Sequence, residues 1–258
     1  MKKVLILTLT LLIFSSFLLP YTISAEKIDS EIVLKDASQK ALDYVLQNKT
    51  TDGIDLIPEI KIMKDKINSG NISEEILTNA SAIKMQDNYS EIIKQVVIDD
   101  LLSNIIIYDD GSFIIVSGET SAKVLNSESE VYPISITSNK IWEQTYYGLG
   151  NQDFLLRYRV YAPYLVKDLQ LKTYFNVQMD LITISSTSTA NTATYYPVVL
   201  NSANSWISQN NSSTVKSKGE YFMTDYVGGI PVYSYKSNLE TVIIKGIHDS
   251  YTIRGYFW

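Results

Sequence analysis

The stretch DLQLKTYFNVQMDL at residues 168–181 decides how the second half of this chain folds. Its odd-numbered residues are apolar apart from Thr173, and its even-numbered residues are polar apart from Tyr174. A period of two residues belongs to a β-strand, whose side chains point alternately to opposite faces, and no helix reproduces it. We therefore expect a long strand with one buried face: Leu169, Leu171, Thr173, Phe175, Val177, Met179 and Leu181.

The same alternation occurs on both sides of this stretch. Four apolar residues upstream are predicted to face the core, and the residues between them the outside: Phe154, Leu156, Tyr158 and Val160 inward, and Arg157, Arg159 and Tyr161 outward. The segment NIIIYDDGSFIIVSG (104–118) has two β-branched runs around Asp110-Gly111, which is typical of a hairpin with a type I′ turn. Further strands are predicted near 131–137, 140–147, 194–200, 219–227, 231–235, 240–247 and 251–257.

About ten strands with no helical segment between them predict an antiparallel β-sandwich, or a barrel-like variant, over residues 104–258. The polar segment SSTSTANTAT (185–194) is expected to be a long loop or an exposed continuation of a strand.

Apolar residues in the region 26–103 follow helical spacing instead. A first helix is predicted to end at Asp52-Gly53, a second covers 60–67, and Ser73 is placed to cap a third that runs to about Lys84. Ser90 is expected to cap a fourth, whose buried face contains six apolar residues: Ile92, Ile93, Val96, Val97, Leu101 and Leu102. A short helical segment before a sandwich makes the predicted fold class α+β.

The first 25 residues, MKKVLILTLTLLIFSSFLLPYTISA, have the lysines, the apolar run and the small final residue of a secretory signal peptide. A retained membrane anchor is the alternative, but about 16 apolar residues fall short of the roughly 20 that span a bilayer. We therefore expect cleavage after Ala25, a secreted or wall-associated chain and no stable membrane span. Residues 26–103 could be removed later as a pro-region, and this question stays open.

Composition narrows the chemistry further. The chain has no cysteine, which excludes disulfides, thiolate metal sites and cysteine nucleophiles, and its formal charge is −6. Loss of Lys2 and Lys3 with the signal makes the charge more negative by two, so a nucleic-acid partner is not expected. No cofactor or metal site is predicted. The absence of cysteine and the short lysine-led signal favour a Gram-positive bacterial source.

Two clusters of polar residues resemble sites but are predicted to be turns. His248, the only histidine, is followed by Asp249 and Ser250, yet a catalytic triad is assembled from separate segments and not from three neighbours. The segment 109–112 (DDGS) lacks the alternating ligands and the distal glutamate of a calcium loop. No catalytic residue is therefore assigned. A carboxylate pair for glycoside hydrolysis stays open, with no two members singled out: Glu128, Glu130, Glu143, Asp153, Glu220 and Asp225.

Aromatic residues give the candidate ligand-binding site. Sixteen of the 19 tyrosines lie from Tyr108 onward. The segment IWEQTYYGLG (141–150) contains Trp142, Tyr146 and Tyr147, which could stack on sugar rings. Packing within the sheet is the alternative interpretation, since tyrosine favours strands. Parity places Trp142 and Tyr146 on one face and Tyr147 on the other.

These observations favour a secreted, non-enzymatic binding module at the cell envelope, with cell-wall polysaccharide or another extracellular protein as partner. Two alternatives remain: an exported hydrolase with a carboxylate pair, and a toxin-like or antimicrobial protein with a helical pro-region. No motif identifies a known family. The C-terminal Trp258 is predicted to pack into the sandwich, so that deletion of the last four residues destabilises the fold.

Overall fold

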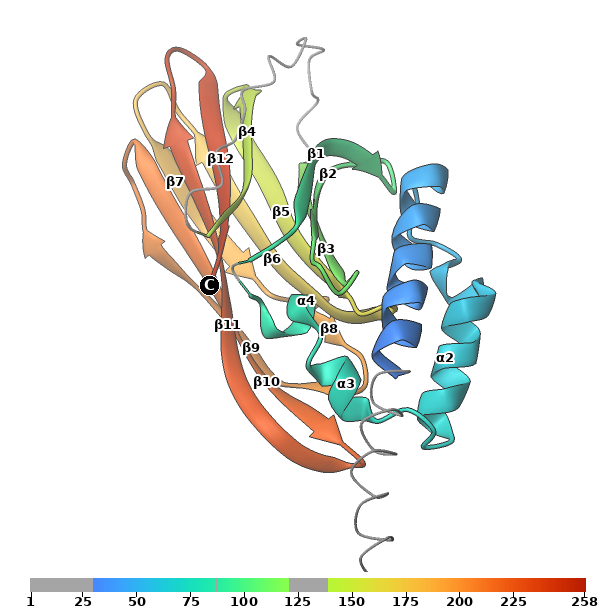
Figure 1. The fold of residues 1–258 in the computed structure, drawn as a ribbon. Coiled ribbons are helices and arrows are strands. Elements are labelled where there is room, and N and C mark those ends of the chain that lie inside the picture. Colours follow the sequence, from blue (N-terminus) through green and yellow to red (C-terminus); the bar gives the residue numbers. More distant parts are fainter. Residues whose placement is uncertain (1–29, 87, 121–138) are drawn as a thin grey trace, which may run out of the picture.

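The computed structural model describes residues 30–86, 88–120 and 139–258 (Figure 1). Two antiparallel β-sheets pack against each other, and helices from the first part of the chain lie beside one of them. This arrangement confirms the predicted α+β class with an antiparallel sandwich. None of the helices within these three ranges combines the length and the apolar character that a membrane crossing requires.

The larger sheet has seven strands in the order β1-β2-β3-β5-β6-β7, and the short β8 also pairs with β6. All its neighbouring strands are antiparallel. The bounds of its strands are β1 Glu91–Ile98, β2 Leu101–Ile107, β3 Phe113–Thr120, β5 Gly150–Tyr161, β6 Leu165–Val177, β7 Ile182–Ser188 and β8 Ala193–Thr194.

The smaller sheet has five strands in the order β4-β12-β11-β10-β9. Its longest strands, β10 and β11, pair along almost their whole length. The sequence predicted two separate strands, 231–235 and 240–247, where the single strand β11 runs. The bounds are β4 Lys140–Tyr147, β9 Val198–Gln209, β10 Thr214–Val227, β11 Ile230–Lys245 and β12 Ser250–Phe257.

The helical layer comprises the first helix and α2, which lie beside the β2–β3 end of the seven-stranded sheet, and α3 and α4, which lie at the end of the sandwich and contact β10 and β5 (Figure 1). The first helix covers residues 30–48 and lies beside α2 (Figure 1). Its buried side is apolar: Leu34, Ala37, Ala41, Leu42 and Val45. Ser73 accepts a hydrogen bond from the backbone of Glu75, so the predicted cap is confirmed. The other elements are η1 Ile54–Leu56, α2 Pro58–Asn68, α3 Glu74–Thr78 and α4 Ser81–Lys84.

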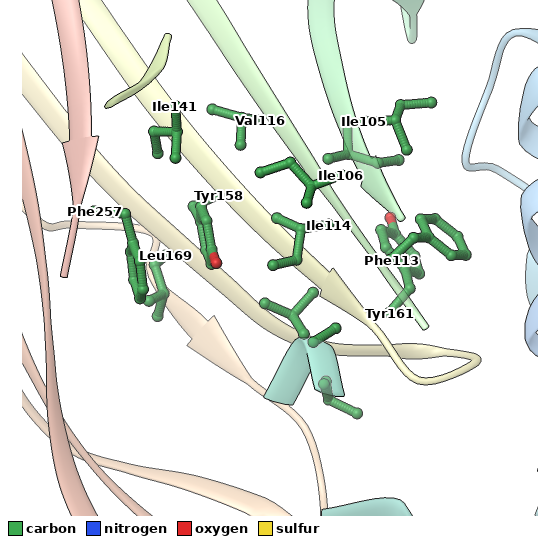
Figure 2. Close-up of a cluster of buried hydrophobic side chains, with 14 of the residues drawn as sticks. Ile105, Ile106, Phe113, Ile114, Val116, Ile141, Tyr158, Tyr161, Leu169 and Phe257 are labelled. Atoms are coloured by element: carbon green, nitrogen blue, oxygen red, sulfur yellow. The ribbon is translucent and has the colours of Figure 1, made fainter. Parts of the chain in front are cut away.

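The interior of the sandwich follows the predicted parity. The four inward residues of β5 are at most 2% exposed, and Leu169, Leu171 and Phe175 of β6 are equally buried. Tyr158 stacks on Phe257 of the opposite sheet, with ring centroids 4.3 Å apart and planes 3° from parallel (Figure 2). Aromatic contacts of this kind join the two sheets, so the C-terminal strand is part of the core.

The fourth predicted helix is wrong. Residues 91–98 and 101–107 are the strands β1 and β2, joined by a turn at Asp99-Asp100 in which both residues have positive φ. A β-bulge lies between Ile93 and Val96, where Gln95 has φ 53°. The extra residue of a bulge reverses the alternation of faces, and this reversal produced spacing that imitates a helix. The β region therefore begins at residue 91, not at 104.

The outward face of β5 is also corrected. Arg159 and Tyr161 were expected to face solvent, but each is 2% exposed, because the helical layer and its adjoining loop cover them. Arg159 donates to Thr51, which follows the first helix, and Tyr161 stacks on Phe113 of β3. The seven-stranded sheet is thus covered on both faces at this end.

Several smaller expectations change as well. Strand β6 ends at Val177, and Met179 is exposed in the turn that follows. The turn after Tyr108 has positive φ at Gly111 and not at Asp110, so it is a type I turn followed by a left-handed glycine, not type I′. The strand predicted at 131–137 lies outside the described residues. Trp258 is 42% exposed, so it does not pack into the sandwich.

Candidate functional site

The aromatic residues predicted to bind a ligand do not form a shared surface. Trp142 is 2% exposed and Tyr146 is 9% exposed, both inside the sandwich, whereas Tyr147 is 50% exposed on the opposite face of β4. The parity of the three side chains is as predicted. Trp142 fits inside because Gly118 of β3 has no side chain where the indole lies, and Gly255 of β12 has none next to Leu156 and the Cβ of Trp142. Trp142 and Tyr146 are therefore core residues in this structure.

The packing of Trp142 predicts that Gly118→Ala destabilises the protein. A Cβ atom at position 118 would lie 2.5 Å from Cε2 of Trp142 and 2.9 Å from Cε2 of Phe154. Overpacking of this kind costs about 1–3 kcal/mol. Urea denaturation should show that loss, and Trp142→Phe in the same chain should recover part of it. Unfolding free energies that add independently in the double variant would contradict the contact.

The segment His248-Asp249-Ser250 is confirmed as a turn. It joins β11 to β12, and His248 has a left-handed φ of 58°. The hydroxyl of Ser250 donates to the carbonyl of Ile247 at 2.8 Å, and His248 is exposed. These three side chains form no nucleophile–base contact among the described residues.

The segment 109–112 is likewise a turn. The carboxylate of Asp110 accepts hydrogen bonds from the backbone N–H groups of Ser81 at 2.6 Å and Ser112 at 3.0 Å. The loop thereby anchors the first turn of α4 to the β2–β3 hairpin. Within the described ranges, no group of three His, Cys, Asp or Glu side chains is arranged to hold a metal ion.

Three of the four described acids that were considered for hydrolysis are bound to cations. Glu143 pairs with Lys140 and Arg254, whose hydrogen bonds lower its pKa although burial alone would raise it. The remaining pairs are Asp153 with Lys172 and Glu220 with Lys236. Glu128 and Glu130 lie outside the described residues. Asp225 is the exception, because its carboxylate has no ion pair within 4.0 Å in the described part of the chain.

Asp225 lies on the interior face of β10 at the open end of the sandwich. It is 1% exposed, and its Oδ1 accepts a hydrogen bond from the hydroxyl of Tyr235 at 3.1 Å. Its Oδ2 is buried and has no hydrogen-bond partner among the described residues. Buried carboxylate oxygens are normally satisfied, so an unpartnered one indicates a place where another molecule can donate.

A pocket of about 460 Å³ reaches this carboxylate. It lies between α4, strand β11 and the end of β12, and we call it the Asp225 pocket. Aromatic rings form much of its wall and two lysines lie at its rim. The side chains on which its chemistry depends are Lys84, Asp225, Tyr233, Tyr235, Lys236 and Trp258.

Lys167 of β6 lies behind the pocket wall. Its side chain is fully buried, its Nζ donates to the carbonyl of Ile83 at 3.1 Å, and it lies 4.5 Å from the ring centroid of Tyr235. Burial lowers the pKa of Lys167 to about 7; Lys84 adds to this effect and Asp225 opposes it. Burial also raises the pKa of Asp225, while Lys167, Tyr235 and Lys84 act in the other direction. The two buried groups therefore stabilise each other's charged forms.

A second, larger pocket of about 790 Å³ lies between the first helix, α3 and the β2–β3 turn. Its lining residues include Ser30, the first described residue, and Asp110. The carboxylate of Asp110 already accepts hydrogen bonds from the backbone of α4 and of Ser112. None of the buried polar atoms that lack a partner among the described residues belongs to this lining. The Asp225 pocket is therefore the better candidate.

Most residues of this site were not singled out from the sequence. Asp225 was one of six acids with nothing to distinguish it, and the tyrosines of β11 were treated as part of a general bias. One signal was present: Lys167 has the same parity as Leu169 and Leu171, which places a lysine on a predicted core face. A buried lysine needs a partner, so this position could have indicated a polar cluster inside the sandwich.

Comparisons with protein-family models and with curated proteins give no match. Among solved structures, one similar chain is a hypothetical protein from Listeria monocytogenes EGD-e, with 14% identity and a TM-score of 0.33. The similarity covers 61% of this chain and 99% of the Listeria chain. A score this low carries no argument about function.

Proposed function

We propose that this chain is a secreted, non-enzymatic binding module of a Gram-positive cell envelope, which holds its ligand in the Asp225 pocket. One observation carries the proposal: Asp225 lines a pocket, and its buried Oδ2 has no hydrogen-bond partner among the described residues. Leaving a buried acceptor unsatisfied costs about 1–3 kcal/mol, and more for a charged group. A ligand that donates to Oδ2 recovers this free energy on binding.

The pocket fits binding better than hydrolysis. Glycoside hydrolysis normally requires two carboxyl groups on opposite sides of the scissile bond. Asp225 is the one acid among the described residues that line the pocket, and Lys167 and Tyr235 surround it from behind. A single carboxylate in an aromatic pocket can orient a ligand by accepting a hydrogen bond, but it lacks the partner that would activate water.

Support for the toxin-like alternative is weaker. A toxin of this kind would need a segment to line a pore, and residues 183–194 suit that role because most of them are small, polar and uncharged. Strand β7 takes up Ile182–Ser188 and pairs with β6, and β8 pairs with β6 as well. Rearrangement at a membrane would have to break these pairings.

Sedimentation with purified Gram-positive cell wall tests the proposal. The secreted chain is expected to pellet with the wall, and Asp225→Asn is expected to weaken retention about tenfold, because a hydrogen bond to a charged group contributes about 1.5–3 kcal/mol. Asp180→Asn is the matched control, since Asp180 is exposed in the turn after β6. Wild-type protein left in the supernatant, or an Asp225→Asn variant that pellets like wild type, would contradict the proposal.

A further inference from the structure

The aromatic side chains that line the Asp225 pocket differ in how many protein groups contact their rings. Tyr233 and Tyr235 stack on each other with centroids 5.5 Å apart, Lys84 lies over Tyr233, and Lys167 lies over Tyr235. Each of these two rings thus has a ring and a lysine next to it, although Tyr233 is 56% exposed. Trp258 has Lys218 over its ring and is still 42% exposed. Tyr233 and Trp258 are therefore the exposed aromatic rings of the pocket, and Trp258 is the one with a single ring contact among the described residues.

The charges around the pocket restrict what can enter. Lys84 and Lys236 are exposed and line the pocket, so a ligand cation meets two ammonium groups there. Lys236 has Glu220 as an ion-pair partner at 3.1 Å. The floor of the pocket is formed by Asp225, whose carboxylate would repel an anionic group of a ligand. The floor therefore suits an uncharged group that donates a hydrogen bond, and the lysines can donate to oxygen atoms nearer the rim.

A group with donors at its edge and an apolar face fits both features. Sugar rings have this form, with hydroxyl groups around the edge and C–H groups on the face. Aromatic side chains with a polar tip favour such amphipathic partners. The amide of Asn139, which also lines the pocket, offers both a donor and an acceptor to further hydroxyl groups.

We infer that the Asp225 pocket holds one saccharide unit of a wall polysaccharide, with a hydroxyl group donating to Asp225 Oδ2 and the sugar face against Trp258. This inference rests on the proposed function and names its ligand class. Lys84 and Lys236 donate to oxygen atoms of the same unit or its neighbour. Peptides of the wall are the competing class, and they lack the combination of a flat C–H face and a hydroxylated edge.

Two exposed tryptophans give a matched pair for the test. Trp258 lines the pocket, whereas Trp206 lies on β9 outside it, and both are 42% exposed. The probes are glycan strands from purified wall, freed of peptide by amidase digestion, and the peptides released in the same digestion. Calorimetric titration is expected to show glycan binding that Trp258→Ala weakens about tenfold, in line with about 1–3 kcal/mol for an aromatic contact at a binding site. Trp206→Ala is expected to bind as wild type does, and the peptides are expected to give no heat.

The outcomes separate this inference from the proposed function. Asp225-dependent sedimentation with intact wall, combined with no glycan binding, would overturn the saccharide and leave the binding function in place. Binding of the peptide fraction would also overturn the saccharide and leave the binding function in place, and it would identify wall peptide as the ligand class. Equal effects of Trp258→Ala and Trp206→Ala would overturn the role of Trp258. Absence of sedimentation contradicts the proposed function itself. Melting curves of each variant verify that lost binding is not lost folding.

Discussion

Replacing Asp99 by asparagine is expected to lower the free energy of unfolding by about 3 kcal/mol. The guanidinium of Arg159 is almost completely buried, and its Nη1 lies 2.6 Å from Oδ2 of Asp99. Its Nε and Nη2 have no hydrogen-bond partner among the described residues, so the contact with Asp99 compensates most of the charge. Removing the carboxylate leaves a buried cation without its anion, which is the costly way to break an ion pair.

The same carboxylate connects three parts of the fold. It accepts hydrogen bonds from the hydroxyl of Thr50 at 2.7 Å and from the backbone N–H of Thr51 at 2.8 Å. These threonines follow the first helix, Asp99 is in the β1–β2 turn, and Arg159 is on β5. The substitution therefore loosens the helical layer from the sheet as well as removing one ion pair.

The effect should depend on pH. Burial alone would raise the pKa of Asp99, but hydrogen bonds from Arg159, Thr51 and Thr50 outweigh it and hold the pKa well below the usual value. A carboxyl group whose folded pKa is depressed contributes stability above its unfolded pKa of about 3.9 and loses that contribution as the pH falls further. The difference between wild type and Asp99→Asn should therefore be full at neutral pH and shrink below about pH 4.

Denaturant unfolding at several pH values measures both effects. Asp100→Asn is the matched control, because Asp100 is the exposed second residue of the same turn, and asparagine tolerates the positive φ at both positions. The control is expected to unfold as wild type does within about 0.5 kcal/mol. If both variants unfold at the same denaturant concentration at neutral pH, Asp99 is not the anion that Arg159 requires.

Phe257→Ala is the second large effect, with an expected loss of about 3–5 kcal/mol. The ring of Phe257 is 9% exposed and stacks on Tyr158 across the two sheets (Figure 2). Its removal leaves a cavity between the sheets at the end of β12, beside the Asp225 pocket, and takes the stacking partner from Tyr158. An aromatic pair of this kind contributes about 0.5–1.5 kcal/mol beyond the buried area.

Trp258→Ala is the natural comparison for this substitution. Trp258 follows Phe257 in the chain and has a larger ring. Because it is 42% exposed, its replacement should lower the free energy of unfolding by less than about 1 kcal/mol. Deletion of residues 255–258 should destabilise at least as much as Phe257→Ala, because β12 also loses its pairing with Leu239, Glu240 and Thr241 of β11. Thermal unfolding of the three variants decides the order. A larger shift for Trp258→Ala than for Phe257→Ala would show that the wrong aromatic residue was assigned to the core.

Local patterns predicted the elements of the sandwich well where nothing interrupts the pleat. The parity of β5 and β6 follows from the geometry of a single strand, so the inward residues could be named without knowing their partners. The same argument failed at Gln95, where one extra residue reverses the faces. It also failed at the outer face of β5. Arg159 is buried there by contact with Thr51, which is 108 residues away in the chain, and a pattern within one strand does not include such a contact.

The candidate site was within reach of the sequence only in part. Composition excluded thiolate chemistry, and parity placed a lysine at position 167 on a core face. Nothing local distinguishes Asp225 from the other acids, because its special property is the lack of a partner for one oxygen. Such a lack depends on all the groups that surround the atom, and these come from different strands.

The sequence by itself thus determined the α+β class, the parity of the central strands and the absence of cysteine chemistry. These properties depend on side-chain order within one segment. The tertiary structure alone decided that Trp142 and Tyr146 belong to the core, and that Lys167, Asp225 and Tyr235 meet at one end of the sandwich. Burial and hydrogen-bond satisfaction are properties of an environment assembled from distant segments, and no single segment contains them.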